Sequence, residues 1–216
     1  MPPAPLPQQL VELSDLLGQM CVTAAGALRH ATTALLEGRE RLAQQVVAGD
    51  AKVDALRARV EELATDALLF HAPVAGDLRV VVAAIRAAGD IERMGDLALH
   101  VAQAAERGRP LPVEVRGEFA EMGRVAVELA LKAAEVVRTR NVVLAMQLDA
   151  DDDEMDVLHR HFFAVLMEQD WPHGVASAVD ITLLARYYER YADHAVVVAH
   201  RTVYAVTGQQ PDTITI

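Results

Sequence analysis

The chain has 216 residues and a formal net charge of −11 at pH 7, and 52% of its residues are hydrophobic while only 4% are aromatic. The acidic balance excludes a nucleic-acid-binding protein, because neutralising phosphates requires clustered lysines and arginines. The apolar residues are mainly Ala, Val and Leu, which favour closely packed helices over strands, so the composition predicts an all-α fold.

The single cysteine, Cys21, lies in an apolar stretch and has no second cysteine with which to form an intrachain disulfide. We interpret it as a small buried packing residue. Neither a secretory signal nor an apolar run long enough to span a bilayer is evident in the sequence. We therefore expect a soluble protein of a reducing compartment, without direct membrane insertion.

The nine prolines divide the chain into long stretches rich in helix formers. Proline inside a helix costs about 3 kcal/mol, so these positions are expected in tails and connections. Two stretches are too long for one helix and are expected to turn near Gly38 and near Asn141, which are suitable helix terminators. A loosely ordered tail is expected over 208–216. The sequence predicts six helices, at residues 8–36, 40–70, 74–107, 114–138, 142–169 and 174–207.

The two halves of the sequence match each other. Leu42 aligns with Leu144 at an offset of 102 residues, and Arg93 aligns with Arg190 at an offset of 97. The change of offset falls in the connection before the third helix of each half, where length changes are tolerated. The expected architecture is two tandem three-helix bundles joined by a short linker. The predicted units span residues 8–107 and 114–207, and the linker spans 108–112.

Acidic residues recur in pairs at equivalent places of the two halves. The pairs are Asp50 with Asp54, Glu92 with Asp96, Asp152 with Asp156, and Glu189 with Asp193. Their i, i+4 spacing places both carboxylates of a pair on one helix face, where like charges repel. In each half, the two pairs lie at similar distances along the chain from the turn between their helices. With a rise of about 1.5 Å per residue, each half can present four carboxylates at one level.

Four carboxylates without a nearby cysteine suit hard, oxygen-seeking cations such as iron(III), manganese or magnesium, and carboxylates can bridge several ions. The glutamates interrupt mainly apolar stripes, so the sites are expected at the water-accessible edge of a helix pair. The alternative is that the acidic residues form solvated faces or pair with Arg93 and Arg190. His159 follows Asp156 by three residues, but all eight histidines are interpreted as surface or packing residues.

Residues 89–96, Gly-Asp-Ile-Glu-Arg-Met-Gly-Asp, closely resemble the D-x-E-R-I-G-D motif of the PhoU family. Residues 188–195 repeat the motif, and the four acidic pairs supply the family's E(D)-x-x-x-D pattern. The resemblance covers essentially the whole chain. The second copy departs from the motif at Tyr187, Tyr191 and Ala192, so its cluster is expected to bind fewer ions, or to bind them more weakly.

This resemblance implies two three-helix bundles that each carry an acidic metal site, often with iron. Zinc, manganese and magnesium are further candidates, and the site can be multinuclear. Members of the family act as negative regulators of the phosphate-starvation response and link the Pst phosphate transporter, through its ATPase subunit, to the PhoR-type sensor histidine kinase. The chain is therefore expected to be a cytoplasmic homodimeric regulator, held at the inner face of the membrane through its partners, and not an enzyme.

Two other functions are compatible with the residues. A carboxylate-bridged metal oxidoreductase or hydrolase would need the acidic clusters alone to supply the chemistry. No Ser/His/Asp arrangement, phosphate-binding glycine loop or Glu-x-x-His pair is evident in the sequence. A metal-free helical adaptor would instead use the acidic pairs to contact arginines of a partner.

Overall fold

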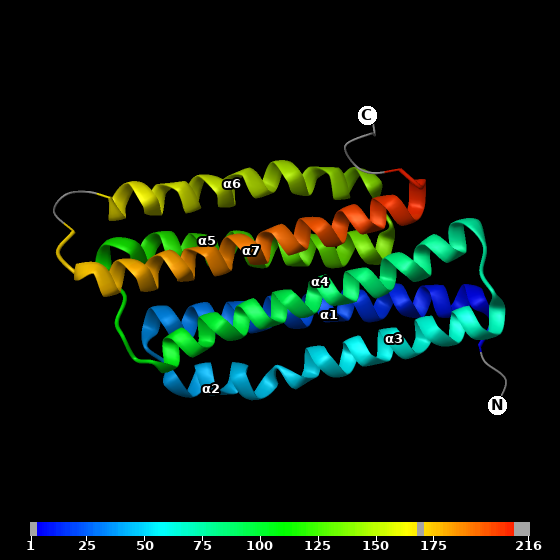
Figure 1. The fold of residues 1–216 in the computed structure, drawn as a ribbon, viewed down its shortest axis with the longest axis horizontal. Coiled ribbons are helices and arrows are strands. Elements are labelled where there is room, and N and C mark those ends of the chain that lie inside the picture. Colours follow the sequence, from blue (N-terminus) through cyan, green and yellow to red (C-terminus); the bar gives the residue numbers. More distant parts are fainter. Residues whose placement is uncertain (1–3, 168–170, 210–216) are drawn as a thin grey trace.

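The computed structural model describes residues 4–167 and 171–209, and these form seven helices with short connections (Figure 1). The helices are α1 (Leu6–Glu37), α2 (Glu40–Gly49), α3 (Ala51–His71), α4 (Ala75–Glu106), α5 (Val113–Thr139), α6 (Val142–Leu166) and α7 (Gly174–Thr207). The all-α prediction is confirmed. Within the described residues, no helix is both long and apolar enough to cross a membrane. The predicted end of the fifth helix at 168–169 and the predicted tail from residue 210 lie outside the described residues.

The predicted helix over 40–70 is interrupted once, at Asp50, and so forms the two segments α2 and α3. Gly49 is the last residue of α2, and Asp50 keeps helical dihedral angles (φ −57°, ψ −41°). The Asp50 carbonyl accepts a hydrogen bond from the Val53 amide, three residues ahead, at 2.9 Å. Glycine weakens a helix through its conformational entropy, so the interruption falls beside the weakest position of this stretch.

Both predicted hairpin turns are confirmed, but the second uses different chemistry. Gly38 follows α1 in the left-handed conformation (φ 66°), and its amide donates to the Ala34 carbonyl. At the second turn, Arg140 takes the left-handed conformation (φ 54°). Asn141 instead accepts a hydrogen bond from the Leu144 amide through Oδ1, at 3.1 Å. Asn141 therefore caps the start of α6 and does not terminate α5.

Four helices form the centre of the molecule. α1 packs against α4 and α5, and α7 packs against α4 and α5. α2 and α3 lie along one edge, on α1 and α4, whereas α6 lies along the opposite edge, on α5 and α7 (Figure 1). Each half is therefore a three-helix unit, with α2 and α3 together forming the interrupted second helix of the first half. The buried side chains of both units form one continuous hydrophobic core.

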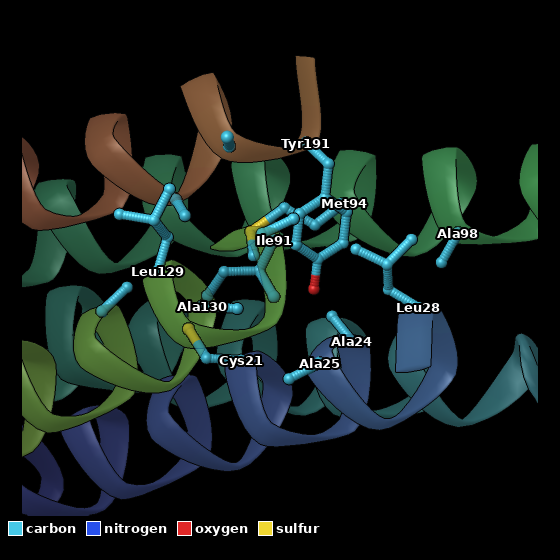
Figure 2. Packing of buried hydrophobic residues seen from close by; sticks show 14 of the residues in the cluster. Cys21, Ala24, Ala25, Leu28, Ile91, Met94, Ala98, Leu129, Ala130 and Tyr191 are labelled. Carbon is cyan, nitrogen blue, oxygen red and sulfur yellow. The ribbon is translucent and has the colours of Figure 1, made fainter. Parts of the chain in front are cut away.

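Small side chains dominate this core and allow the helices to approach closely. Met94 of α4 and Tyr191 of α7, which occupy equivalent positions of the repeat, are both fully buried in it, as is Ile91 (Figure 2). Cys21 is buried as predicted. Burial raises the pKa of the Cys21 thiol to about 12, which keeps it protonated and unreactive.

Gly123 marks a close approach of α5 to α1. A Cβ atom at this position would lie 2.7 Å from Thr32 Cγ2 and 3.0 Å from Thr32 Oγ1. The Thr32 hydroxyl is already committed, because it donates to the Leu28 carbonyl at 2.8 Å and shares a hydrogen bond with the Tyr188 hydroxyl at 2.9 Å. The buried Thr32–Tyr188 bond joins α1 of the first half to α7 of the second.

We expect Gly123→Ala to lower the free energy of unfolding by about 1–3 kcal/mol, because the added methyl group overfills the contact with Thr32. Urea denaturation followed by circular dichroism measures the change. Gly117→Ala in the same helix is the matched control, since nothing lies within 4 Å of its Cβ position. The control should be as stable as the parent protein, or up to about 1 kcal/mol more stable. Equal stability of the two variants would contradict the close α1–α5 contact.

Candidate functional site

The first group of four carboxylates lies where the break between α2 and α3 faces the middle of α4. We call it cluster 1; it comprises Asp50 at the break, Asp54 in the first turn of α3, and Glu92 and Asp96 of α4. Burial raises the pKa of Asp50, and the charges of Asp54, Asp96 and Glu92 raise it further. The structure therefore brings the four carboxylates close enough to repel one another.

Two arginines neutralise part of cluster 1. Arg57 Nη1 lies 2.8 Å from Glu92 Oε1, and Arg93 Nη1 lies 2.8 Å from Asp96 Oδ2. The Glu92 and Asp96 side chains are 23% and 33% exposed, so water partly screens both pairs and each contributes little stability. Pairing with Arg93, the alternative considered for the acidic residues, thus holds for Asp96.

The second group occupies the equivalent place between α6 and α7. We call it cluster 2; it comprises Asp152 and Asp156 of α6 with Glu189 and Asp193 of α7. Burial raises the pKa of Asp152 to about 7, and the charges of Asp193, Asp156 and Glu189 add to the rise. Burial also raises the pKa of Glu189, and the charge of Asp193 raises it further. The ion pair with Arg186 opposes this rise but does not cancel it.

Two carboxylate oxygens of cluster 2, Asp152 Oδ1 and Glu189 Oε2, are buried without a hydrogen-bond partner among the described residues. A buried acceptor left unsatisfied costs roughly 1–3 kcal/mol, so such atoms call for an explanation such as an ion, a water or a functional role. The Glu189 side chain is only 13% exposed. Asp152 and Glu189 therefore each keep a buried oxygen without a partner, whereas Asp156 and Asp193 of cluster 2 are exposed. Among the described residues, cluster 2 has one ion pair to an arginine and cluster 1 has two, although the sequence of cluster 2 departs further from the family motif.

The donor atoms of both clusters suit a hard cation, but their present arrangement is not that of a closed metal site. Across residues 4–167 and 171–209, no group of three or more His, Cys, Asp or Glu side chains is arranged so that it could hold a metal ion. Binding would require the carboxylates to rotate, and Glu92 would have to leave Arg57. The chemistry of the oxygen donors nevertheless fits such an ion, and the two unsatisfied oxygens of cluster 2 fit it best.

One histidine lies within electrostatic reach of cluster 2. Burial lowers the pKa of His159 on α6, Arg186 lowers it further, and the charges of Asp156 and Asp193 oppose this effect. Neutral imidazole, the form favoured by burial, is the form that binds metal ions. The i, i+3 spacing from Asp156 is the sequence signal for His159, although the sequence alone favours a surface or packing role.

Asp90, the first acidic residue of the motif, belongs to neither cluster. Its carboxylate reaches across to α7, where it accepts a hydrogen bond from Arg201 Nε and lies 3.3 Å from His194 Nδ1. Burial alone would raise the pKa of Asp90, but the hydrogen bonds from His194 and Arg201 outweigh burial and lower it. Tyr187, the equivalent residue of the second half, contacts His100 of α4 with ring centroids 5.1 Å apart. Both positions therefore serve the contact between α4 and α7.

Asp152→Asn is expected to stabilise the metal-free protein at alkaline pH. The pKa of Asp152 is about 7 in the folded chain, whereas its ordinary value is 3.8. Between these pH values the folded protein keeps a proton that the unfolded chain has lost. The free energy of unfolding therefore falls as the pH rises from 3.8 to about 7. The asparagine amide carries no charge, so the variant avoids the cost of ionising this carboxyl in the folded protein. We expect a gain of roughly 1 kcal/mol or more in the free energy of unfolding at pH 8, and a smaller gain at pH 5.

Urea denaturation in EDTA at the two pH values measures this effect. Asp153→Asn, which makes the same charge change at an exposed neighbour, is the control and should show no comparable pH dependence. A loss of stability in Asp152→Asn that is equal at both pH values would show that the pKa of Asp152 is not raised in the folded protein.

Comparison with known proteins finds the same two-fold repeat. The family model described as the PhoU domain matches the chain twice, over residues 17–105 and 119–202. The chain belongs to the PhoU family. The two PhoU matches coincide with the two three-helix units, and each contains one acidic cluster. The predicted family resemblance and the tandem repeat are thereby confirmed.

Relatives match nearly the full length of the chain. It is 55% identical over 207 residues to the phosphate-specific transport system accessory protein PhoU homolog 2 of Mycobacterium tuberculosis, covering 94% of this chain and 97% of the relative. It is 52% identical over 212 residues to PhoU homolog 1 of Mycobacterium leprae, covering 97% and 96%.

Solved structures share the fold. The crystal structure of PhoU from Pseudomonas aeruginosa superposes with a TM-score of 0.86 at 24% identity, covering 95% of this chain and 100% of that one. The phosphate transport system regulatory protein PhoU from Streptococcus pneumoniae superposes with a TM-score of 0.79 at 21% identity, covering 98% and 100%. At these identities the structural matches establish the architecture.

Proposed function

We propose that this PhoU-family protein is a metal-binding regulator of phosphate uptake. In this role it represses the phosphate-starvation response and links the ATPase subunit of a Pst-type phosphate transporter to a PhoR-type sensor histidine kinase. The names of its relatives, which are accessory proteins of phosphate-specific transport systems, support a regulatory role. It acts by binding and not by catalysis, as a cytoplasmic homodimer held at the inner face of the membrane by its partners.

The metal-binding part of the proposal is carried by the two buried carboxylate oxygens of cluster 2 that have no partner. Asp152, Asp156, Glu189 and Asp193 would hold the ion, and the four carboxylates of cluster 1 would form the second site. The bound cation supplies positive charge, with iron as the first candidate and zinc, manganese or magnesium as the others. By sharing an ion, the carboxylates of each cluster would fasten an outer helix to a central one.

Protein purified without a metal-affinity tag is expected to contain bound metal that depends on the clusters. Elemental analysis should show less metal in Glu189→Ala, Asp193→Ala and in Glu92→Ala, Asp96→Ala, because each double variant removes two oxygen ligands from one cluster. Glu62→Ala, Asp66→Ala is the matched control, since it removes an acidic pair of the same spacing from α3 outside both clusters. Equal metal content in all three variants would remove the metal-binding part of the proposal.

A metal-free adaptor is the second candidate, and the arginine pairs of cluster 1 favour it. Glu92 and Asp96 already form ion pairs with Arg57 and Arg93 of this chain. Arginines of a partner could form the same ion pairs. Partner binding that survives complete chelation, but is lost when Glu92 and Asp96 are reversed to lysine, would select the adaptor over the metal regulator.

Deletion of the gene is expected to abolish repression of phosphate-starvation genes in phosphate-rich medium, because the link from transporter to kinase would be missing. A transcriptional reporter of a phosphate-starvation promoter measures the effect, and reintroduction of the intact gene serves as the control. An unchanged starvation response in the deletion strain would refute the regulatory role.

A further inference from the structure

A cavity of about 610 Å³ lies where the linker joins the two halves. Its volume falls in the range of small-molecule binding sites. Buried apolar side chains from four segments form its floor: Leu35 of α1, Ala104 of α4, Leu111 of the linker, and Ile181 and Leu184 of α7. None of the eight cluster carboxylates lines it, so this cavity is separate from the candidate metal sites.

The rim of this cavity is cationic, although the whole chain carries a net charge of −11. Arg107, Arg109, Arg116 and His173 line it, and Asp180 is the one acidic side chain among the described lining residues. Arg109 Nη1 lies 2.8 Å from Asp180 Oδ2 and neutralises it. The rim therefore keeps the positive charges of Arg107 and Arg116.

Two features place hydrogen-bond donors at the lining of the cavity. Arg116 Nε donates to the Leu111 carbonyl at 3.0 Å, which fixes the guanidinium while its terminal nitrogens make no hydrogen bond within the described residues. Ala176 and Ser177, in the first turn of α7, also line the cavity. No side chain caps the start of this 34-residue helix, so its first amides are available to an anion.

Acidic side chains next to this cavity restrict where an anion can bind. The adjoining cavity is lined by three of them, Glu37, Glu40 and Glu106. Arg109 and Arg116 line both cavities and so lie between these glutamates and the apolar floor. His173 lies 3.3 Å from Glu114, which reduces the contribution of this histidine to the positive rim. An anionic group is therefore expected beside Arg107, Arg116 and the start of α7.

We propose that this cavity binds a nucleoside phosphate, with the base on the apolar floor and the phosphates against Arg107, Arg116 and the first turn of α7. Guanidinium groups and helix N-termini are both suited to phosphate oxygens, and the apolar floor suits an aromatic base. The site goes beyond the proposed function and does not depend on the acidic clusters. Because its lining comes from both halves, the bound ligand would also hold the two halves together.

Isothermal titration calorimetry with ATP in EDTA tests this site. We expect the intact protein to bind ATP, and Arg107→Gln, Arg116→Gln to bind it at least about tenfold more weakly, because two charge-assisted contacts are lost. Adenosine alone and inorganic phosphate alone should each bind at least about tenfold more weakly than ATP, because each engages only one part of the cavity. The matched control is Arg86→Gln, Arg160→Gln, which removes two exposed arginines outside the cavity and should bind ATP normally.

Ala176→Trp provides a second test that leaves the charge unchanged. Residue 176 is exposed at the cavity, so the indole is expected to block the site and abolish ATP binding in a folded protein. No ATP binding by the intact protein at millimolar concentration would overturn the proposal. Binding that is unchanged in both cavity variants would also overturn it, whatever the metal content of the clusters proves to be.

Discussion

The close approach of the four central helices is the constraint on which the rest of the molecule depends. Gly123 leaves room for Thr32, and the hydroxyl of Thr32 in turn holds Tyr188, so α1, α5 and α7 are fixed relative to one another. Asp90 adds a charged link between α4 and α7 through Arg201 and His194. This centre is built mainly from small apolar side chains, and the outer helices add further buried side chains, such as Val60 and Phe162, to the same core.

The acidic clusters lie where an outer helix meets a central one, and their carboxylates work against folding. Cluster 2 holds acidic side chains whose burial and mutual repulsion raise the pKa values of Asp152 and Glu189. Cluster 1 offsets part of the same repulsion with Arg57 and Arg93. The two halves thus share one backbone plan but balance their charges differently. A ligand that neutralises carboxylates would have more to gain in the second half, where one cluster carboxylate forms an ion pair with an arginine, against two in the first half.

Local signals were enough to predict the helices except for the break at Asp50, because proline positions, Gly38 and the repeat report directly on where a chain can turn. The height of each carboxylate along its helix could also be predicted, by counting residues from the turn that joins the two helices. This works because the rise per residue of a helix is constant. Orientation about the helix axis was less accessible, so the role of Asp90 was missed: its partner Arg201 lies 111 positions further along the chain. The cavity beside the linker was missed for the same reason, as it exists only once both halves are assembled.

The shared core also bears on how such a protein could arise. Equivalent helices of the two units pack on each other, α1 on α5 and α4 on α7. This is the pattern of a two-fold interface between identical subunits, in which each surface meets its own copy. A single three-helix unit would bury the same surface by pairing with a second copy of itself. Once two such units are joined in one chain, equivalent positions no longer have to be identical, and Met94 and Tyr191 differ in this way inside the common core.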